Sequence, residues 1–190
     1  KLIKIMASKF VLGSPSQEFY RELVSDIEKR NINVLSVGFA MVYQFYDAVS
    51  QNATTDRLKR SLEWINPHKR FTVVAATPLS IEDDVRRADI VYIHGGNGDT
   101  LQSYFNHFTT DQLKDMFDGV VCSGHSAGAN FWADCYYSND NQAICEGMGI
   151  LPIKTFSHYQ SWKFEKLFEL AMHKSELPLI PLIDGDYIVI

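Results

Sequence analysis

The sequence contains little cysteine, and this scarcity excludes two classes of protein. Three cysteines, Cys122, Cys135 and Cys145, are an odd number in 190 residues and too few to form a disulfide scaffold. No C-x-x-C pair is present to indicate a zinc site. We therefore expect three free thiols, which is the cysteine usage of a cytoplasmic protein.

Long apolar runs and basic stripes are also missing. The run at 33–42, NVLSVGFAMV, is far shorter than the roughly 20 residues of a membrane span, and the apolar block near the start is too short for a signal peptide. The net charge is −5 and the Lys and Arg residues are scattered. We therefore expect a cytoplasmic protein with neither a membrane nor a nucleic acid as partner, and the sequence is silent on its oligomeric state.

The composition is that of an ordinary globular protein. Hydrophobic residues make up 46% and charged residues 22%, which excludes a disordered chain. We expect a single α/β domain over residues 1–190, long enough to bury a substantial core. Because the chain stops on an apolar run, we also expect that a short C-terminal tail is lacking.

Apolar runs alternate with helical patterns along the chain. In the first helical pattern Ser14 can act as N-cap, Pro15 suits the first turn, and apolar residues recur every four positions. Apolar strands separated by helices predict a mostly parallel sheet covered on both faces. The expected strands are 2–7, 32–40, 70–76, 89–93, 119–124, 177–183 and 186–190, and the expected helices are 14–30, 54–65, 80–88, one beginning near 126, and 161–174.

A serine between two glycines follows one of these strands. Residues 124–128 read Gly-His-Ser-Ala-Gly, the G-x-S-x-G pattern that exposes a nucleophile on a strand-to-helix turn. The N–H of Ala127 is the natural first donor to an oxyanion at Ser126. The alternative is that Ser126 only caps a helix in a glycine-rich connection.

A second glycine loop, Gly95-Gly96-Asn97, follows another predicted strand. Because ligands gather at the carboxyl ends of parallel strands, it should lie near Ser126, with Gly96 as the second oxyanion donor. A phosphate loop is the alternative, but the stretch GGNGDT has neither G-x-G-x-x-G nor the Lys-Ser/Thr of a P-loop.

These two stretches carry a resemblance to a known family. VYIHGGNGDTLQ at 91–102, followed by GHSAGAN at 124–130, resembles peptidase E, the aspartyl dipeptidases, whose wider group includes the cyanophycinases. The resemblance implies a three-layer α/β/α sandwich of the class I glutamine amidotransferase-like type, with serine in place of the cysteine nucleophile.

A serine nucleophile needs a histidine as base. His158, in TFSHYQ, follows the elbow in a predicted loop after an apolar segment, and it matches the place of the family's catalytic histidine. The side chain of His125 should diverge from Ser126, and His94 is expected to line the pocket. His68, His107 and His173 have the polar surroundings of surface histidines.

The third member of the triad is a carboxylate that the family places soon after the elbow helix. In YYSNDNQ, Asp140 matches that place with a shift of one residue. Asp134, expected on the same helix as Ser126, and Glu146 are the alternatives. An acid in a polar stretch of this kind can also be part of a turn and nothing more.

Together these residues predict acyl transfer to Ser126 without a metal or an organic cofactor, with Asn97 and His94 binding a short peptide. An Asp-Xaa dipeptidase needs a cation for the aspartate, yet no arginine follows His158. Lys163 is a candidate substitute, but its place on a helix rich in Phe and Leu favours a surface residue. A cyanophycinase-like or other serine hydrolase remains an alternative, as does a non-catalytic binding protein.

Overall fold

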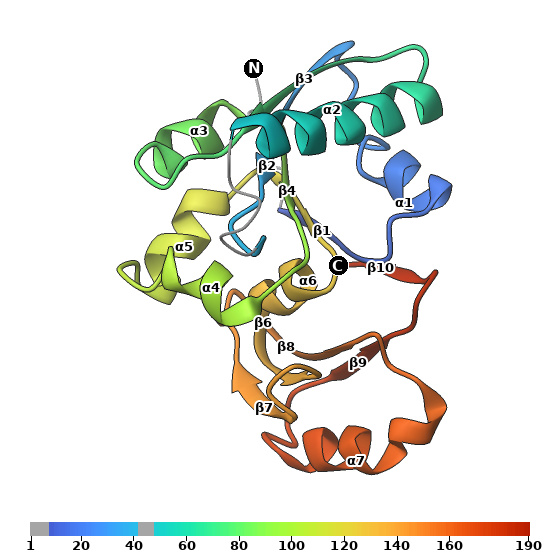
Figure 1. Ribbon diagram of the computed structural model, residues 1–190, viewed down its shortest axis with the longest axis vertical. Helices are drawn as coiled ribbons and strands as arrows, with labels where there is room; N and C mark the ends of the chain where they lie inside the picture. The colour runs from blue at the N-terminus through green and yellow to red at the C-terminus, as the bar shows by residue number, and fades with distance from the viewer. Residues whose placement is uncertain (1–7, 42–47) are drawn as a thin grey trace, which may run out of the picture.

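The computed structural model describes residues 8–41 and 48–190. In this part of the chain the strands form two sheets, a six-stranded one of order β10-β1-β5-β4-β2-β3 and a four-stranded one of order β7-β6-β8-β9. The larger sheet and its helices occupy the upper part of Figure 1, and the smaller sheet lies below them beside α7.

The elements alternate along the first two thirds of the chain, as expected. The strands are β1 (Lys9–Gly13), β2 (Asn31–Val37), β3 (Arg70–Ala75), β4 (Ile90–Ile93), β5 (Val121–Gly124), β6 (Ala133–Ser138), β7 (Ala143–Glu146), β8 (Leu151–Ser157), β9 (Leu179–Leu182) and β10 (Tyr187–Val189). The helices are α1 (Gln17–Glu22), α2 (Ala48–Ile65), α3 (Ile81–Arg87), α4 (Gly98–Ser103), α5 (Thr110–Phe117), α6 (Ala127–Trp132) and α7 (Phe164–Met172), with a 3-10 turn at Ser161–Lys163.

Helices cover both faces of the six-stranded sheet. Side chains of α1 and α2, such as Phe19 and Leu62, pack with Val34 and Tyr92 on one face. A larger cluster on the other face includes side chains of α3, α4, α5 and α6. Burial of one large apolar side chain is worth about 1.5–3 kcal/mol, so both layers contribute to stability. The three-layer α/β/α arrangement is the one that the sequence predicts.

Four parallel pairings hold the larger sheet together. β1 pairs with β5, β5 with β4, β4 with β2 and β2 with β3, and only β10 joins antiparallel, along β1. The carboxyl ends of β4 and β5 therefore lie side by side, with Ile93 opposite Gly124. This register brings the glycine loop after β4 next to the serine turn after β5.

The short helix α6 connects the two sheets. All six of its residues are buried, because it packs against β4 and β5 as well as against β8. The Phe131 ring makes an edge-to-face contact with Phe105, and the Trp132 ring makes one with Phe117. A helix buried all round is firmly placed, so the serine turn before it is held by the core.

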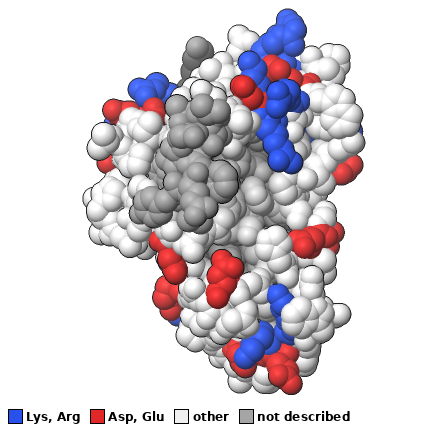
Figure 2. Space-filling view, in the orientation of Figure 1, with Lys and Arg blue, Asp and Glu red and all other residues white. Residues whose placement is uncertain are grey.

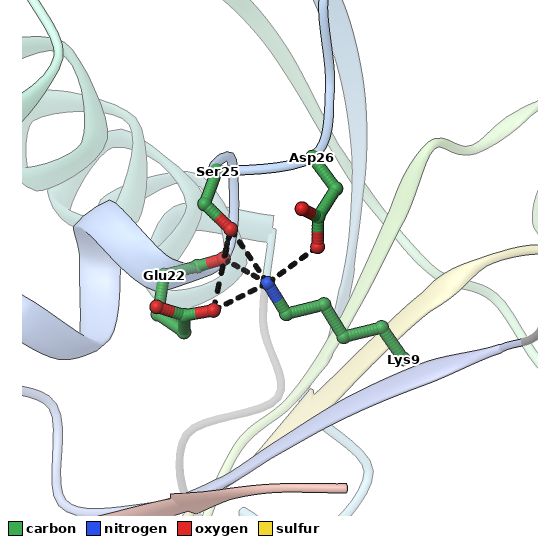
Figure 3. Close-up of polar contacts among 4 residues, drawn as sticks. All are labelled: Lys9, Glu22, Ser25 and Asp26. Carbon is green, nitrogen blue, oxygen red and sulfur yellow. Dashed lines mark hydrogen bonds and ion pairs between the residues drawn. The ribbon is translucent and has the colours of Figure 1, made fainter.

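A partly exposed charge cluster fastens α1 to the start of β1 (Figure 3). The Lys9 ammonium donates to the Glu22 carboxylate at 2.5 Å, to Ser25 Oγ at 2.6 Å and to the Asp26 carboxylate at 2.8 Å. Burial lowers the pKa of Lys9, but the hydrogen bonds to Asp26 and Glu22 outweigh it and the pKa is raised. Lys9 is therefore charged at neutral pH and ties the turn after α1 to the sheet.

Several local predictions differ from the structure. The helix that begins at the elbow ends at Trp132, so that Asp134 lies in strand β6 and not on the helix. The first helix spans only Gln17–Glu22, and its N-cap is Ser16, whose side chain accepts from the Phe19 N–H, not Ser14. The strand expected at 2–7 lies outside the described residues, and β1 follows it in the chain.

Charge is unevenly spread over the face seen in Figure 2. Lys and Arg side chains gather over α2 with acidic side chains beside them, and the lower part carries several acidic side chains with a smaller group of Lys and Arg. Within residues 8–41 and 48–190, no helix is both long and apolar enough to cross a membrane. The cytoplasmic location and the single domain over 1–190 stay predictions.

Candidate active site

Ser126 occupies a strained turn between β5 and α6. Its backbone has φ 54° and ψ −122°, a left-handed conformation that costs a non-glycine residue on the order of 1–3 kcal/mol. Gly128 allows the close approach of α6 to β4, since a Cβ there would overlap the carbonyl oxygen of Ile93. The turn is a nucleophile elbow in its usual strand-to-helix context.

The glycine loop after β4 packs directly on this elbow. A Cβ on Gly95 would lie 2.9 Å from the Ser126 Cβ. Gly96 has φ 139°, and a Cβ there would overlap the carbonyl oxygen of Ala40. Asn97 is the N-cap of α4, where its Oδ1 accepts the Thr100 N–H at 2.8 Å. The loop therefore has one well-defined backbone conformation beside the serine.

A polar pocket gathers most of the predicted site residues. We call it the Ser126 pocket. Its lining comes from the glycine loop, the elbow, the β6–β7 turn and the end of β8: Gly96, Asn97, Gly98, Asp99, Ser126, Ala127, Asn130, Tyr136, Ser138, Asn139, Asp140, Asn141, Ser157 and His158. The structure thus brings Ser126, His158, Asp140, Gly96, Ala127 and Asn97 to one place, as the sequence led us to expect.

His158 has a carboxylate partner that the sequence analysis did not identify. Its Nδ1 lies 2.5 Å from Oδ1 of Asp184, in the turn between β9 and β10. Both side chains are exposed, 50% for His158 and 62% for Asp184. His158 also has φ 57°, so that the chain turns sharply where β8 ends. Such a pair holds one ring nitrogen of the histidine and leaves the other for a proton transfer.

The pairing of β8 with β9 explains why these two residues meet. The strands are parallel, with Ser157 opposite Leu182, so His158 and Asp184 follow the same edge of the small sheet. The Tyr159 N–H donates to the carbonyl of Leu182 at 3.1 Å and continues the ladder past His158. The rule that site residues follow the carboxyl ends of neighbouring parallel strands located the glycine loop, and it applies to Asp184 as well. To use it here, one must know that β8 and β9 are neighbours, which the sequence does not tell.

Buried hydroxyls join the small sheet to the elbow helix. Oδ1 of Asn130, on α6, accepts from Thr155 Oγ1 and lies 2.9 Å from Ser157 Oγ, which is also 3.2 Å from the carbonyl oxygen of Ser126. Asn130 and Ser157 are both buried. These contacts set the position of β8, and hence of His158, relative to the nucleophile.

The three acids considered from the sequence have other surroundings. Asp140 lines the Ser126 pocket, but no hydrogen bond joins it to His158 in the described structure. Asp134 and Glu146 both pair with Lys174, at 2.5 and 2.7 Å. Asp134 and Glu146 are therefore both paired with Lys174 and not with His158. The carboxylate that contacts His158 Nδ1 is that of Asp184, not that of Asp140.

Two other histidines lie on the opposite side of the elbow. His94 is 93% buried, and its Nε2 is 2.8 Å from Ser36 Oγ. With His125 it lines a second cavity beside α1 and α2, not the Ser126 pocket where we expected it. Burial lowers the pKa of His94 to about 3, helped by His125, and lowers that of His125 to about 4, helped by His158. Both are therefore neutral at neutral pH.

The described residues hold no group of His, Cys, Asp and Glu side chains arranged to bind a metal ion. What the Ser126 pocket does hold is a strained serine, a histidine on a carboxylate and a glycine loop, at the carboxyl ends of a parallel sheet. These features define a hydrolase that uses a serine nucleophile on an α/β/α sandwich.

Comparison with known proteins gives the family. The model of peptidase family S51 matches residues 7–190, so the chain belongs to this family and is a serine peptidase. A search of curated proteins finds no match. The resemblance to peptidase E is thereby confirmed, and family membership speaks against the non-catalytic binding protein.

Two solved structures share the fold. One, from Listeria monocytogenes EGD-e and provisionally described as a peptidase E protein, is 15% identical with a TM-score of 0.62 and covers 97% of this chain and 98% of its own. The other, a peptidase from an acI-B1 Actinobacterium, is 18% identical with a TM-score of 0.63 and covers 98% of this chain and 84% of its own. They support the α/β/α fold.

Proposed function

We propose that the protein hydrolyses short peptides through an acyl-enzyme on Ser126. The observation that carries this proposal is the strained elbow serine in one pocket with His158. As general base, His158 takes the hydroxyl proton while Ser126 Oγ attacks the peptide carbonyl. His158 then gives that proton to the departing amine, and water releases the acyl group by the same steps.

Two backbone N–H groups stabilise the oxyanion that forms in each step. The Ala127 N–H belongs to the first turn of α6, where N–H groups have no partner within the helix. The Gly96 N–H lies in the loop that packs on Ser126. Removal of one such donor typically costs about 10²–10³ in kcat, so the fixed loop geometry matters for the rate.

Asp184 is the proposed acid of the triad, in place of Asp140. Its contact with Nδ1 selects the tautomer of His158 whose Nε2 accepts a proton, and it stabilises the imidazolium that forms. Asp140 instead contributes negative charge to the pocket wall.

The pocket lining bears on the choice of substrate. Two carboxylates, Asp99 and Asp140, line it, and neither Lys nor Arg is among its described lining residues. Lys163 lies behind the wall, where its ammonium donates to Asn139 Oδ1 at 2.5 Å. A free α-ammonium of a short peptide suits this lining better than an aspartyl side chain, so we propose that Asp-Xaa dipeptides are not the preferred substrates.

Hydrolysis of a dipeptide panel tests the proposal. Asp-Xaa, Ala-Xaa and Lys-Xaa peptides are incubated with wild type and with Ser126→Ala, which should lose about 10⁴-fold or more in kcat. Cleavage that depends on Ser126 and is at least as fast for Ala-Xaa or Lys-Xaa as for Asp-Xaa supports the proposal. Cleavage confined to Asp-Xaa would contradict the substrate choice, and equal cleavage by Ser126→Ala would contradict the mechanism.

A further inference from the structure

His125, the residue before the proposed nucleophile, contacts the glycine loop from behind. Its Nε2 accepts the Gly95 N–H at 3.3 Å, and a Cβ on Gly95 would lie 3.1 Å from its ring. On its other side, Nδ1 lies 3.1 Å from the Tyr92 hydroxyl. The side chain therefore diverges from Ser126, as the sequence predicts, but it reaches the backbone that packs on Ser126.

These contacts leave one N–H of the loop for the substrate. Of three consecutive amides, that of Gly95 donates to His125 and that of Asn97 donates to the carbonyl of Ala40 at 2.7 Å. No acceptor for the Gly96 N–H is found within the described residues. Fixing the amides on both sides of Gly96 fixes the peptide plane between them.

Only one tautomer of His125 can make both contacts. The Gly95 N–H is a donor, so Nε2 must be unprotonated and the ring proton must be on Nδ1, where it donates to the Tyr92 oxygen. Tyr92 is buried, and its hydroxyl oxygen can accept that proton. The Gly95 N–H therefore selects the tautomer of His125, and the Tyr92 hydroxyl stabilises it from the side remote from the loop.

We propose that His125 is a positioning residue that aligns the Gly96 N–H for the oxyanion, in a tautomer stabilised by Tyr92. This inference rests on the proposed acyl-enzyme mechanism and adds to it a residue that touches no reacting atom. The lowered pKa of His125, about 4 through burial and the nearby His158, keeps the ring neutral and able to accept at neutral pH.

The rate at which a small fluorophosphonate reacts with Ser126 measures this alignment without a peptide substrate, because the phosphoryl oxygen occupies the oxyanion site. His125→Phe keeps a ring without an acceptor and should slow the reaction about 10- to 100-fold, somewhat less than the complete loss of a donor. In His125→Gln the amide oxygen can take the place of Nε2, and the rate should stay within about threefold of wild type. His68→Phe, at an exposed histidine, is the control and should react at the wild-type rate.

Tyr92→Phe separates positioning from simple packing. Without the hydroxyl, the Nδ1 proton of His125 loses its acceptor, so the tautomer that accepts from Gly95 is less stable and the rate should fall several-fold. Glutamine has no tautomers, so Tyr92→Phe added to His125→Gln should cause no further fall. An equal fall in both backgrounds would overturn the inference, as would a wild-type rate for His125→Phe or a loss in His125→Gln as large as in His125→Phe.

The controls distinguish a failure of the positioning role from a failure of the proposed function. If the probe fails to label wild type, or labels Ser126→Ala equally, the acyl-enzyme mechanism itself is wrong. If Ser126 is labelled but the rate does not depend on His125, only the positioning role is wrong. Thermal unfolding of each variant shows whether it is folded at the assay temperature, and where His125→Phe is not, the comparison of Tyr92→Phe in the two backgrounds decides.

Discussion

The two sheets supply different halves of the site and hold their histidines in different ways. The six-stranded sheet provides Ser126 and the glycine loop, and its two histidines, the buried His94 and the partly buried His125, are neutral. The four-stranded sheet provides His158, which is half exposed and lies on a carboxylate. The residues that fix backbone geometry are in the core, whereas the residue that must exchange protons has access to water.

The largest expected effect is a loss of kcat that distinguishes Asp184, which contacts His158, from Asp140, the acid predicted from the sequence. Asp184→Asn keeps the shape of the side chain but removes the charge that stabilises the His158 imidazolium, so kcat should fall by about 10²–10⁴. Asp140→Asn, in the pocket wall, should change kcat by less than about tenfold. Steady-state kinetics on a dipeptide that the wild type cleaves distinguishes the two. A larger loss in Asp140→Asn would restore Asp140 as the third triad member.

The small sheet should depend on a single buried cation. The Lys154 ammonium donates to the carbonyls of Ala171, His173 and Lys174 at the end of α7, at distances of 2.7–3.1 Å. Lys154→Met leaves these carbonyls without that donor and should lower the free energy of unfolding by about 2–3 kcal/mol. Lys166→Met, which breaks an exposed pair with Glu169, should lower the stability far less than Lys154→Met does. Urea denaturation compares the two variants. Equal losses of unfolding free energy would contradict the role of Lys154 as the donor to the carbonyls at the end of α7.

The two histidines that follow β4 and β5 make the stability of the protein depend on pH. Their pKa values, about 3 for His94 and about 4 for His125, lie below the 6.5 of an ordinary histidine. The unfolded chain therefore binds more protons below pH 6.5, and this stability is present above pH 6.5 and is lost as the pH falls towards 4.

Replacement of one buried histidine should flatten that dependence. Between pH 4.5 and 6, in His94→Gln, unfolding free energies from urea titrations should change less steeply than in wild type, by up to about 1.4 kcal/mol per pH unit, the value for one proton. Between pH 7.5 and 8.5 the two proteins should have the same slope. An unchanged slope at acid pH would show that His94 is not neutral in the folded protein.

The smallest effect concerns the junction between the two sheets. Ser157→Ala removes the hydroxyl that contacts Asn130 and the Ser126 carbonyl, and it should cost about 1 kcal/mol of stability. Because His158 is the next residue, kcat should also fall several-fold with little change in KM. Ser103→Ala, at an exposed hydroxyl bonded within α4, should leave kcat unchanged. A Ser157→Ala enzyme with full activity would mean that the junction does not position the base.

The large sheet was predictable because its signals are local. The runs that became β1, β2, β4 and β5 are mostly buried, and a strand followed by glycines and a helix places Ser126 and Gly96 at the same edge. The small sheet was less predictable. The chain after Trp132 continues without a turn signal into β6, so the sequence favours a longer helix, and tertiary packing overrides that preference.

The sequence by itself determined the fold class and the elbow and named His158 as the candidate base, since each depends on residues close together in the chain. Only the tertiary structure decided which carboxylate contacts His158, because Asp184 is 26 residues away and reaches it through the pairing of β8 with β9. The same holds for His125, whose contact with Gly95 spans 30 residues and two strands. Strand order and register are set by how all the apolar faces pack together, and that information is distributed over the whole chain.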